Sequence, residues 1–275
     1  IFKRIMAIKG KGILIWCGAG ANHRALAVKI ATRFPVAGIV IDDKPVKKKR
    51  SIFAILSLIL DRLRFKEIYD AWSKLQSYYN DKFPLWPEVP LIRVSDINSE
   101  EAASFSKEQN PALIIVSGTS LIKEKLLTVP ASVGIINLHT GLSPYVKGGP
   151  NCTNWCIANN DWHLVGNTIM WINAGIDSGN IIASETVDIT ESVDLFNAQK
   201  LVMEQAHSLY LDVIEYLLTS SPPFISVSQQ SIAKGNLFLT KMWTPKQKIN
   251  LLRNWKNRRS IKRLTPPFTV SLPRN

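Results

Sequence analysis

The sequence is poor in cysteine. Among its 275 residues only Cys17, Cys152 and Cys156 are present, an odd number set among apolar residues. This excludes a disulfide framework as the source of stability and is typical of a reducing compartment, so we expect a cytoplasmic protein. With 46% hydrophobic and 20% charged residues, 14 glycines and 15 prolines, the composition also excludes collagen-like and disordered chains. We therefore expect a globular chain with a large core.

Long hydrophobic runs are also missing. The most apolar stretch covers ten residues, 51–60, whereas a helix needs about 20 to cross a bilayer. The stretch lies too far into the chain to be a signal peptide. We therefore expect no membrane span.

The region around this stretch has no glycine or proline between Pro45 and Pro84. Its apolar residues recur at helical spacing, which predicts a helical insertion at about 46–83. The favoured interpretation is packing, either in the core or between the subunits of a homodimer. The alternative is a peripheral membrane contact through residues 47–63, because four cations precede the apolar stretch: Lys47, Lys48, Lys49 and Arg50.

Acidic residues are absent from the last 60 positions, which hold 11 Lys and Arg. The first 50 residues hold 12 Lys and Arg against two acids, whereas residues 51–215 hold 11 against 19. A chain with an acidic middle does not resemble a wholly basic nucleic-acid binder, so nucleic acid is not the expected partner. The two basic ends could still hold a phosphorylated ligand, RNA or an anionic membrane.

Apolar runs of strand length alternate with helical patterns along the chain, which predicts an α/β fold. We expect a Rossmann-like, mostly parallel sheet with helices on both faces. A catalytic domain would cover 1–220, and a small C-terminal module would cover 221–275, after the break at Pro222 and Pro223. The predicted strands are 12–17, 36–41, 112–116, 133–138, 168–172 and 181–187, and the predicted helices include 121–127 and 195–218.

A glycine turn follows the first predicted strand. Gly18 and Gly20 resemble the start of a dinucleotide fingerprint, but His23 stands where a third glycine belongs. Backbone N–H groups at the start of the following helix would suit a phosphate. The turn, with Asn22, is therefore a candidate substrate-binding segment.

Polar side chains end the strand predicted at 133–138. Because strand side chains alternate, Asn137 and His139 project from the same face, at the edge where open α/β sheets bind ligands. An amide can donate a hydrogen bond to a developing oxyanion while an imidazole accepts or donates a proton. Asp177 lies in a loop between Gly175 and Gly179, and a carboxylate near an imidazole orients it and raises its pKa.

The segment from Asn137 to Pro144 and the loop from Gly175 to Gly179 resemble the folate-dependent formyltransferase family. Its members include glycinamide ribonucleotide transformylase, methionyl-tRNA formyltransferase and the sugar N-formyltransferases. The family pattern is Asn-x-His-x-(Ser/Gly)-Leu-x-Pro, followed by a loop of the type Gly-x-Asp-(Thr/Ser)-Gly. The resemblance also covers residues 114–122 and 165–169, and it is specific over about 110–190.

The resemblance implies transfer of a formyl group from N10-formyltetrahydrofolate, the co-substrate, to a primary amine. Asn137 would stabilise the oxyanion, His139 would assist proton removal and polarise the intermediate, and Asp177 would hold the imidazole and relay a proton. No metal is implied. The folate would lie against backbone of two segments: Ser117, Gly118, Thr119, Leu121 and Ile122, and Ala174, Gly175 and Ile176.

The acceptor amine follows less directly from the resemblance. The C-terminal runs 235–239 and 243–247 resemble the tails of sugar N-formyltransferases, which favours a nucleotide-linked amino sugar. The expected contacts with it are Gly18, Gly20, Asn22, Tyr145 and Lys147. Two alternatives stay open: formylation of methionyl-tRNA, and hydrolysis of formyltetrahydrofolate on the same scaffold.

Overall fold

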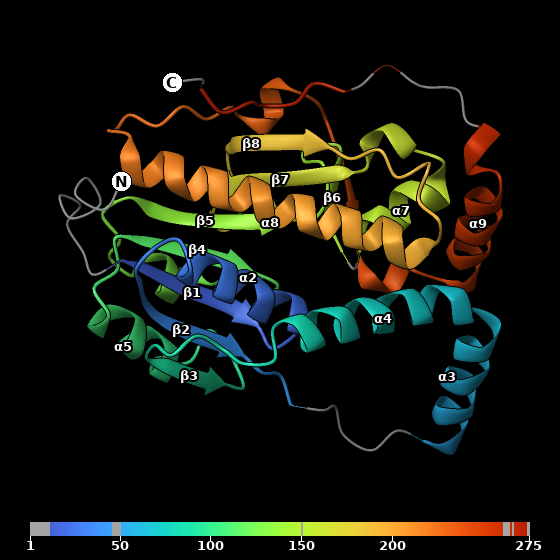
Figure 1. Cartoon of the computed structure of the whole chain (residues 1–275), viewed down its shortest axis with the longest axis horizontal. Coiled ribbons are helices and arrows are strands. Elements are labelled where there is room, and N and C mark those ends of the chain that lie inside the picture. The colour runs from blue at the N-terminus through green and yellow to red at the C-terminus, as the bar shows by residue number, and fades with distance from the viewer. Residues whose placement is uncertain (1–11, 46–50, 150, 261–264, 266, 274–275) are drawn as a thin grey trace.

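The core of the molecule is a seven-stranded sheet (Figure 1), seen in a computed structural model that describes residues 12–45, 51–149, 151–260, 265 and 267–273. The strand order is β3-β2-β1-β4-β5-β7-β8. The strands are β1 (Ile13–Gly18), β2 (Val36–Asp42), β3 (Leu91–Val94), β4 (Leu113–Ser117), β5 (Gly134–His139), β7 (Gly166–Trp171) and β8 (Ile181–Thr186).

The five strands from β3 to β5 are parallel, and β7 and β8 run antiparallel to their neighbours. Cys17 of β1 pairs with Ser117 of β4, and Val116 pairs with Asn137 of β5. The carboxyl ends of these three strands therefore lie side by side at one edge of the sheet. This confirms the predicted mostly parallel, Rossmann-like α/β class.

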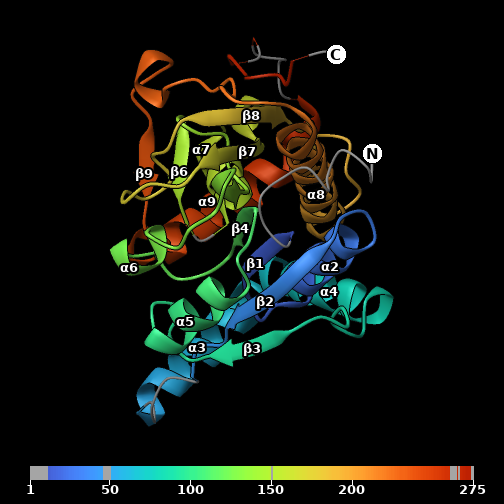
Figure 2. The ribbon, with the colours of Figure 1, turned by 90° about the vertical axis from the view of Figure 1, so that its left-hand side faces the viewer.

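Helices cover both faces of the sheet. Successive strand residues point to opposite faces, and both sets are apolar and buried. Residues such as Ile13, Ile15 and Leu113 pack on one side with α2 (Ala21–Ala31) and α8 (Leu195–Thr219). Leu14 and Ile114 pack on the other side with α5 (Glu100–Glu108) and α6 (Glu124–Leu127). Figure 2 shows the two helical layers on opposite sides of the strands.

The predicted insertion forms two helices, α3 (Ile52–Arg64) and α4 (Lys66–Lys82), while residues 46–50 lie outside the described part of the chain. Helix α4 packs on α2 and α8 through Leu75 and Tyr79, which are fully buried. Helix α3 buries none of its residues, so the expectation that its apolar stretch packs in the core is wrong. In the described ranges, no helix is both long and apolar enough to cross a bilayer.

The described residues after 220 lie against the rest of the molecule. Strand β9 (Asn236–Phe238) pairs in parallel with β6 (Val146–Gly148), and α9 (Pro245–Lys256) packs on α7 (Cys152–Asn159). The backbone of Val270 bonds that of Ser184 on the edge strand β8. Four short 3₁₀ turns complete the described elements, at Trp162–Leu164, Gln229–Ser231, Thr240–Met242 and Arg258–Ser260.

A tyrosine from α8 joins the two central strands that lead into the polar edge. The hydroxyl of the fully buried Tyr210 receives a hydrogen bond from Val116 N (3.0 Å) and donates to the carbonyl oxygen of Ile136 (2.9 Å), with that of Val116 at 3.2 Å. The hydroxyl therefore links backbone groups of both strands. Tyr210 thus holds the ends of β4 and β5 next to Ser117 and Asn137.

We expect Tyr210→Phe to lower the free energy of unfolding by about 1–3 kcal/mol, because it removes the buried hydrogen bonds of this hydroxyl. Urea denaturation measures this loss. Tyr78→Phe, at a half-buried ring on α4, is the control and should change the free energy by less than about 0.5 kcal/mol. Equal stability of the Tyr210 and Tyr78 variants would contradict the structural role of the hydroxyl.

Candidate active site

Three side chains of one face of β5 lead to the polar edge of the sheet. Ile135, Asn137 and His139 alternate with Ile136 and Leu138, which point into the core beneath α8. His139 is buried, at 7% exposure, whereas Asn137 is half-buried. The strand therefore presents an amide and an imidazole to the same space.

The carboxylate of Asp177 meets both groups. Asn137 Nδ2 donates to Asp177 Oδ1 at 3.3 Å, His139 Nδ1 lies 3.4 Å from Oδ2, and the backbone N–H of Gly148 donates to Oδ2 at 2.9 Å. Asp177 has φ +44°, a left-handed conformation that asparagine and aspartate adopt more readily than most residues. The structure thus brings together the three predicted catalytic residues, from segments 40 residues apart.

Both ring nitrogens of His139 face acceptors. Nε2 lies 3.0 Å from the carbonyl oxygen of Val146, and Nδ1 faces Asp177. Because a carbonyl and a carboxylate only accept, both nitrogens must donate, as in an imidazolium. Burial opposes this charge, but the Asp177 carboxylate outweighs it, with help from Cys152 and Val146, and raises the pKa of His139 to about 10. His139 is therefore cationic at neutral pH.

A glutamine from beyond residue 220 fixes the loop of Asp177. Gln229 Nε2 donates to the carbonyl oxygens of Asp177 and Gly179, each at 2.8 Å, and the side chain is 5% exposed. Strand β9 holds Gly148, whose N–H donates to the carboxylate of Asp177, because Phe238 pairs with Gly148. Neither contribution is predicted by the sequence, since no local motif marks a glutamine or a three-residue strand.

The predicted glycine turn lies next to the end of β4. A Cβ on Gly18 would come within 2.7 Å of the carbonyl oxygen of Gly118, so the two turns touch. His23 fills the position of the missing glycine, and its Nδ1 lies 3.1 Å from Ser117 Oγ. Burial lowers the pKa of His23 to about 4, so its ring is neutral.

A side chain of α4 already bonds the start of α2. Gln76 of α4 accepts a hydrogen bond from the backbone N–H of Ala21 (2.9 Å) and donates to Oδ1 of the buried Asn22 (3.1 Å). A phosphate at Gly18, Gly20 and Asn22 would have to displace this side chain. The proposed substrate contact at the turn stays a prediction.

The segments predicted for the folate differ in exposure. Asp42 fixes the turn after β4 by accepting hydrogen bonds from Ser120 N (2.7 Å) and Oγ (2.9 Å). Within and beside this turn, Ser117 and Ile122 are buried, Gly118 has φ +70°, Thr119 is half-buried and Leu121 is exposed. In the other segment Ala174, Gly175 and Ile176 are all exposed.

The two predicted substrate residues on the β6 segment are half-buried. The hydroxyl of Tyr145 lies 3.5 Å from the carbonyl oxygen of Phe268, and Lys147 pairs with Leu237 in the small sheet. Both stay predicted contacts. Among the described residues, no group of three or more His, Cys, Asp or Glu is placed to hold a metal ion.

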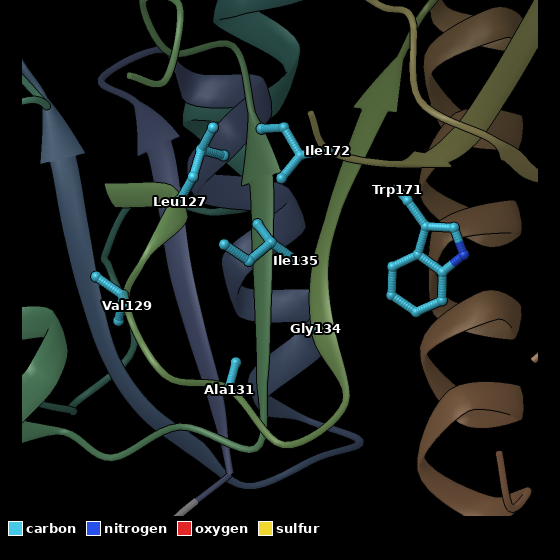
Figure 3. A pocket seen from close by; sticks show the side chains of 7 residues that line it. All are labelled: Leu127, Val129, Ala131, Gly134, Ile135, Trp171 and Ile172. Atoms are coloured by element: carbon cyan, nitrogen blue, oxygen red, sulfur yellow. The ribbon is translucent and has the colours of Figure 1, made fainter. Parts of the chain in front are cut away.

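A cavity of about 300 Å³ with apolar lining side chains lies along the start of β5, before its polar end (Figure 3). It includes Ile135, two residues before Asn137 on the same strand face, and Ile172 at the start of the loop that carries Asp177. Figure 3 shows the indole of Trp171 turned away from the other lining side chains, and it contacts Phe224 instead. The lining residues were not predicted: Leu127, Val129, Ala131, Gly134, Ile135, Trp171 and Ile172.

Known proteins share this fold and part of this sequence. A methionyl-tRNA formyltransferase of Clostridium botulinum is 29% identical over 136 residues, which are 49% of this chain and 43% of that protein. This chain therefore spans less than half of that relative's length. A solved structure of a likely sugar N-formyltransferase from Mycobacterium tuberculosis has a TM-score of 0.56 at 17% identity, covering 88% of this chain and 87% of that one.

A sugar 3-N-formyltransferase, solved in the presence of dTDP and 5-N-formyl-THF, has a TM-score of 0.54 at 13% identity, with 89% of this chain and 79% of that chain covered. These two structural similarities show the fold. The model of the formyl transferase family matches residues 80–214, which contain Asn137, His139, Asp177 and the cavity. Over these 135 of its 275 residues, this chain matches the formyl transferase family.

Proposed function

We propose that the chain transfers a formyl group from N10-formyltetrahydrofolate to a primary amine. The observation that carries this proposal is the convergence of Asn137, His139 and Asp177 at the end of a strand whose start lines an apolar cavity. A formyl carbon at this point would have a charge-stabilising group and a proton carrier within reach, while the rest of the donor lies in the cavity.

The cavity supports the choice of donor. Leu127, Val129, Ile135 and Ile172 give it apolar walls, and its volume lies at the lower end of the range of ligand pockets. Ile172, one of the lining residues, leads into the exposed loop 174–176, whose backbone would supply hydrogen-bonding groups. A flat heterocycle with polar edges, such as a pterin, fits these surroundings.

Each of the three polar residues has a separate role in the proposed reaction. Among the described residues, Asn137 Nδ2 bonds only to Asp177, so its second N–H can reach an oxyanion. The positive charge of His139 supports its polarising role, since it would attract the same oxyanion. Asp177 holds the imidazolium and is the nearby group that can relay a proton from the amine.

For the acceptor, we propose a nucleotide-linked amino sugar. The similarity to the likely sugar N-formyltransferase extends over 88% of this chain, and so includes at least part of the segment after residue 220. That segment supports the site through Gln229 and β9. The methionyl-tRNA formyltransferase of Clostridium botulinum, which matches only 49% of this chain, makes methionyl-tRNA the second candidate.

The test is to mix the protein with N10-formyltetrahydrofolate, with and without amino-sugar nucleotides or methionyl-tRNA, and to follow deformylation. We expect turnover only with an amino-sugar nucleotide. Asn137→Ala should lower kcat by about 10²–10³ while folate binding survives, because an oxyanion donor acts mainly in the transition state. Turnover without any amine would instead indicate hydrolysis, and turnover only with methionyl-tRNA would transfer the proposal to that acceptor.

The protonation of His139 gives a pH prediction. Its folded-state pKa is raised, so the stabilisation from the pair with Asp177 is complete below pH 6.5 and is lost as pH rises through about 10. We expect nitrogen NMR shifts to report an imidazolium at neutral pH. In Asp177→Asn the opposing charge is gone, so burial should dominate and the ring should be neutral at the same pH. A neutral His139 in the unaltered protein would contradict this assignment.

Gln229 should act on turnover by positioning Asp177. We expect Gln229→Leu to lower kcat by about tenfold to a hundredfold with little change in KM for the folate, because a small displacement of the carboxylate misaligns the site. The matched control is Gln230→Leu, since the neighbouring glutamine is exposed. Equal kinetics for the two variants would show that the loop keeps its place without Gln229.

A further inference from the structure

Helix α3 carries an apolar stripe that nothing in the described structure covers. The stripe consists of Ile52, Phe53, Leu56, Ile59, Leu60 and Leu63, which recur at helical spacing and are 48–84% exposed. Figure 1 shows α3 beyond the outer end of α4, and Figure 2 shows it protruding at the lower periphery of the molecule. An exposed stripe of this kind marks a binding surface.

The orientation of the stripe is set by its opposite side. Asp61 lies across the helix from the stripe, and its carboxylate accepts hydrogen bonds from Lys248 of α9 and Tyr69 of α4. The next residue after α3, Phe65, is 2% exposed and anchors the turn into α4. These contacts hold the polar side against the protein, so the apolar side must face outward.

Positive charge borders the stripe on both sides. Arg62 and Arg64 are exposed and lie at its two edges, and Lys66 follows. Asp61 is the only acid in residues 44–66, against eight Lys and Arg in the sequence. A second copy of the chain docking through this helix would bring two such clusters together, which opposes self-association.

We propose that α3 docks the protein on an anionic lipid bilayer. The stripe would lie among the acyl chains at the interface while the flanking cations meet lipid phosphates. The helix lies in the membrane surface and does not cross it. The net charge of +13 adds long-range attraction to the same surface.

The test is co-sedimentation of the full chain with vesicles of phosphatidylcholine alone or of an equal mixture with phosphatidylglycerol. We expect binding to the mixed vesicles, at least tenfold weaker binding to the neutral ones, and weaker binding when salt rises from about 0.1 M to about 1 M. Arg62→Gln and Arg64→Gln should each weaken binding about fivefold. Phe53→Asp with Leu60→Asp should weaken it by about tenfold or more per residue.

The control is Leu85→Asp with Ile225→Asp, two apolar side chains that are 76% and 58% exposed elsewhere on the surface. These changes should leave vesicle binding intact. All variants should keep the circular dichroism and thermal melting of the unaltered protein, because α3 buries none of its residues. Equal binding to neutral vesicles, or none to the mixed ones, would overturn the proposal. So would a dimer in solution that the Phe53→Asp, Leu60→Asp variant dissociates.

Discussion

Three polar groups from two segments, β5 and β6, converge on the carboxylate of Asp177, and the geometry of the site depends on this convergence. The side chain is only 13% exposed, and a buried carboxylate is costly unless it is paired and hydrogen-bonded. Asn137, His139 and the N–H of Gly148 supply these partners. The same contacts fix the amide and the imidazole relative to each other. The interactions that stabilise the charge of Asp177 therefore also set the geometry of the site.

The segment after residue 220 carries much of this geometry although it lies far away in the sequence. Strand β9 holds the backbone of Gly148 by pairing with β6, and Phe238 stacks on Trp155 of α7 with ring centroids 4.6 Å apart. Gln229 holds the other side of the carboxylate loop. A truncated chain that kept only the central sheet would retain Asn137 and His139 but lose the supports that place Asp177 against them.

Sequence patterns predicted the parts of the molecule that depend on local periodicity. The strands from β1 to β8 that are long and apolar, and helix α8, were predicted within a few residues, whereas β3 was missed because it is short and contains Arg93. Asn137 and His139 followed from strand alternation, and Asp177 from family resemblance. Gln229, Gln76 and the cavity were not predictable, because each depends on which segments meet in three dimensions. The exposure of α3 escaped prediction for the same reason: Lys248, far along the chain, decides which side of the helix faces inward.

The charge state of His139 constrains the proposed reaction. An imidazolium whose two nitrogens both donate cannot also take a proton from the attacking amine. Each carboxylate oxygen has two acceptor positions. Asp177 Oδ2 accepts from Gly148 N and faces His139 Nδ1, whereas among the described residues Oδ1 accepts from Asn137 alone. The remaining position on Oδ1 lies beside the amide that would bind the oxyanion. In the proposed reaction the proton therefore passes through Asp177, while His139 contributes its charge.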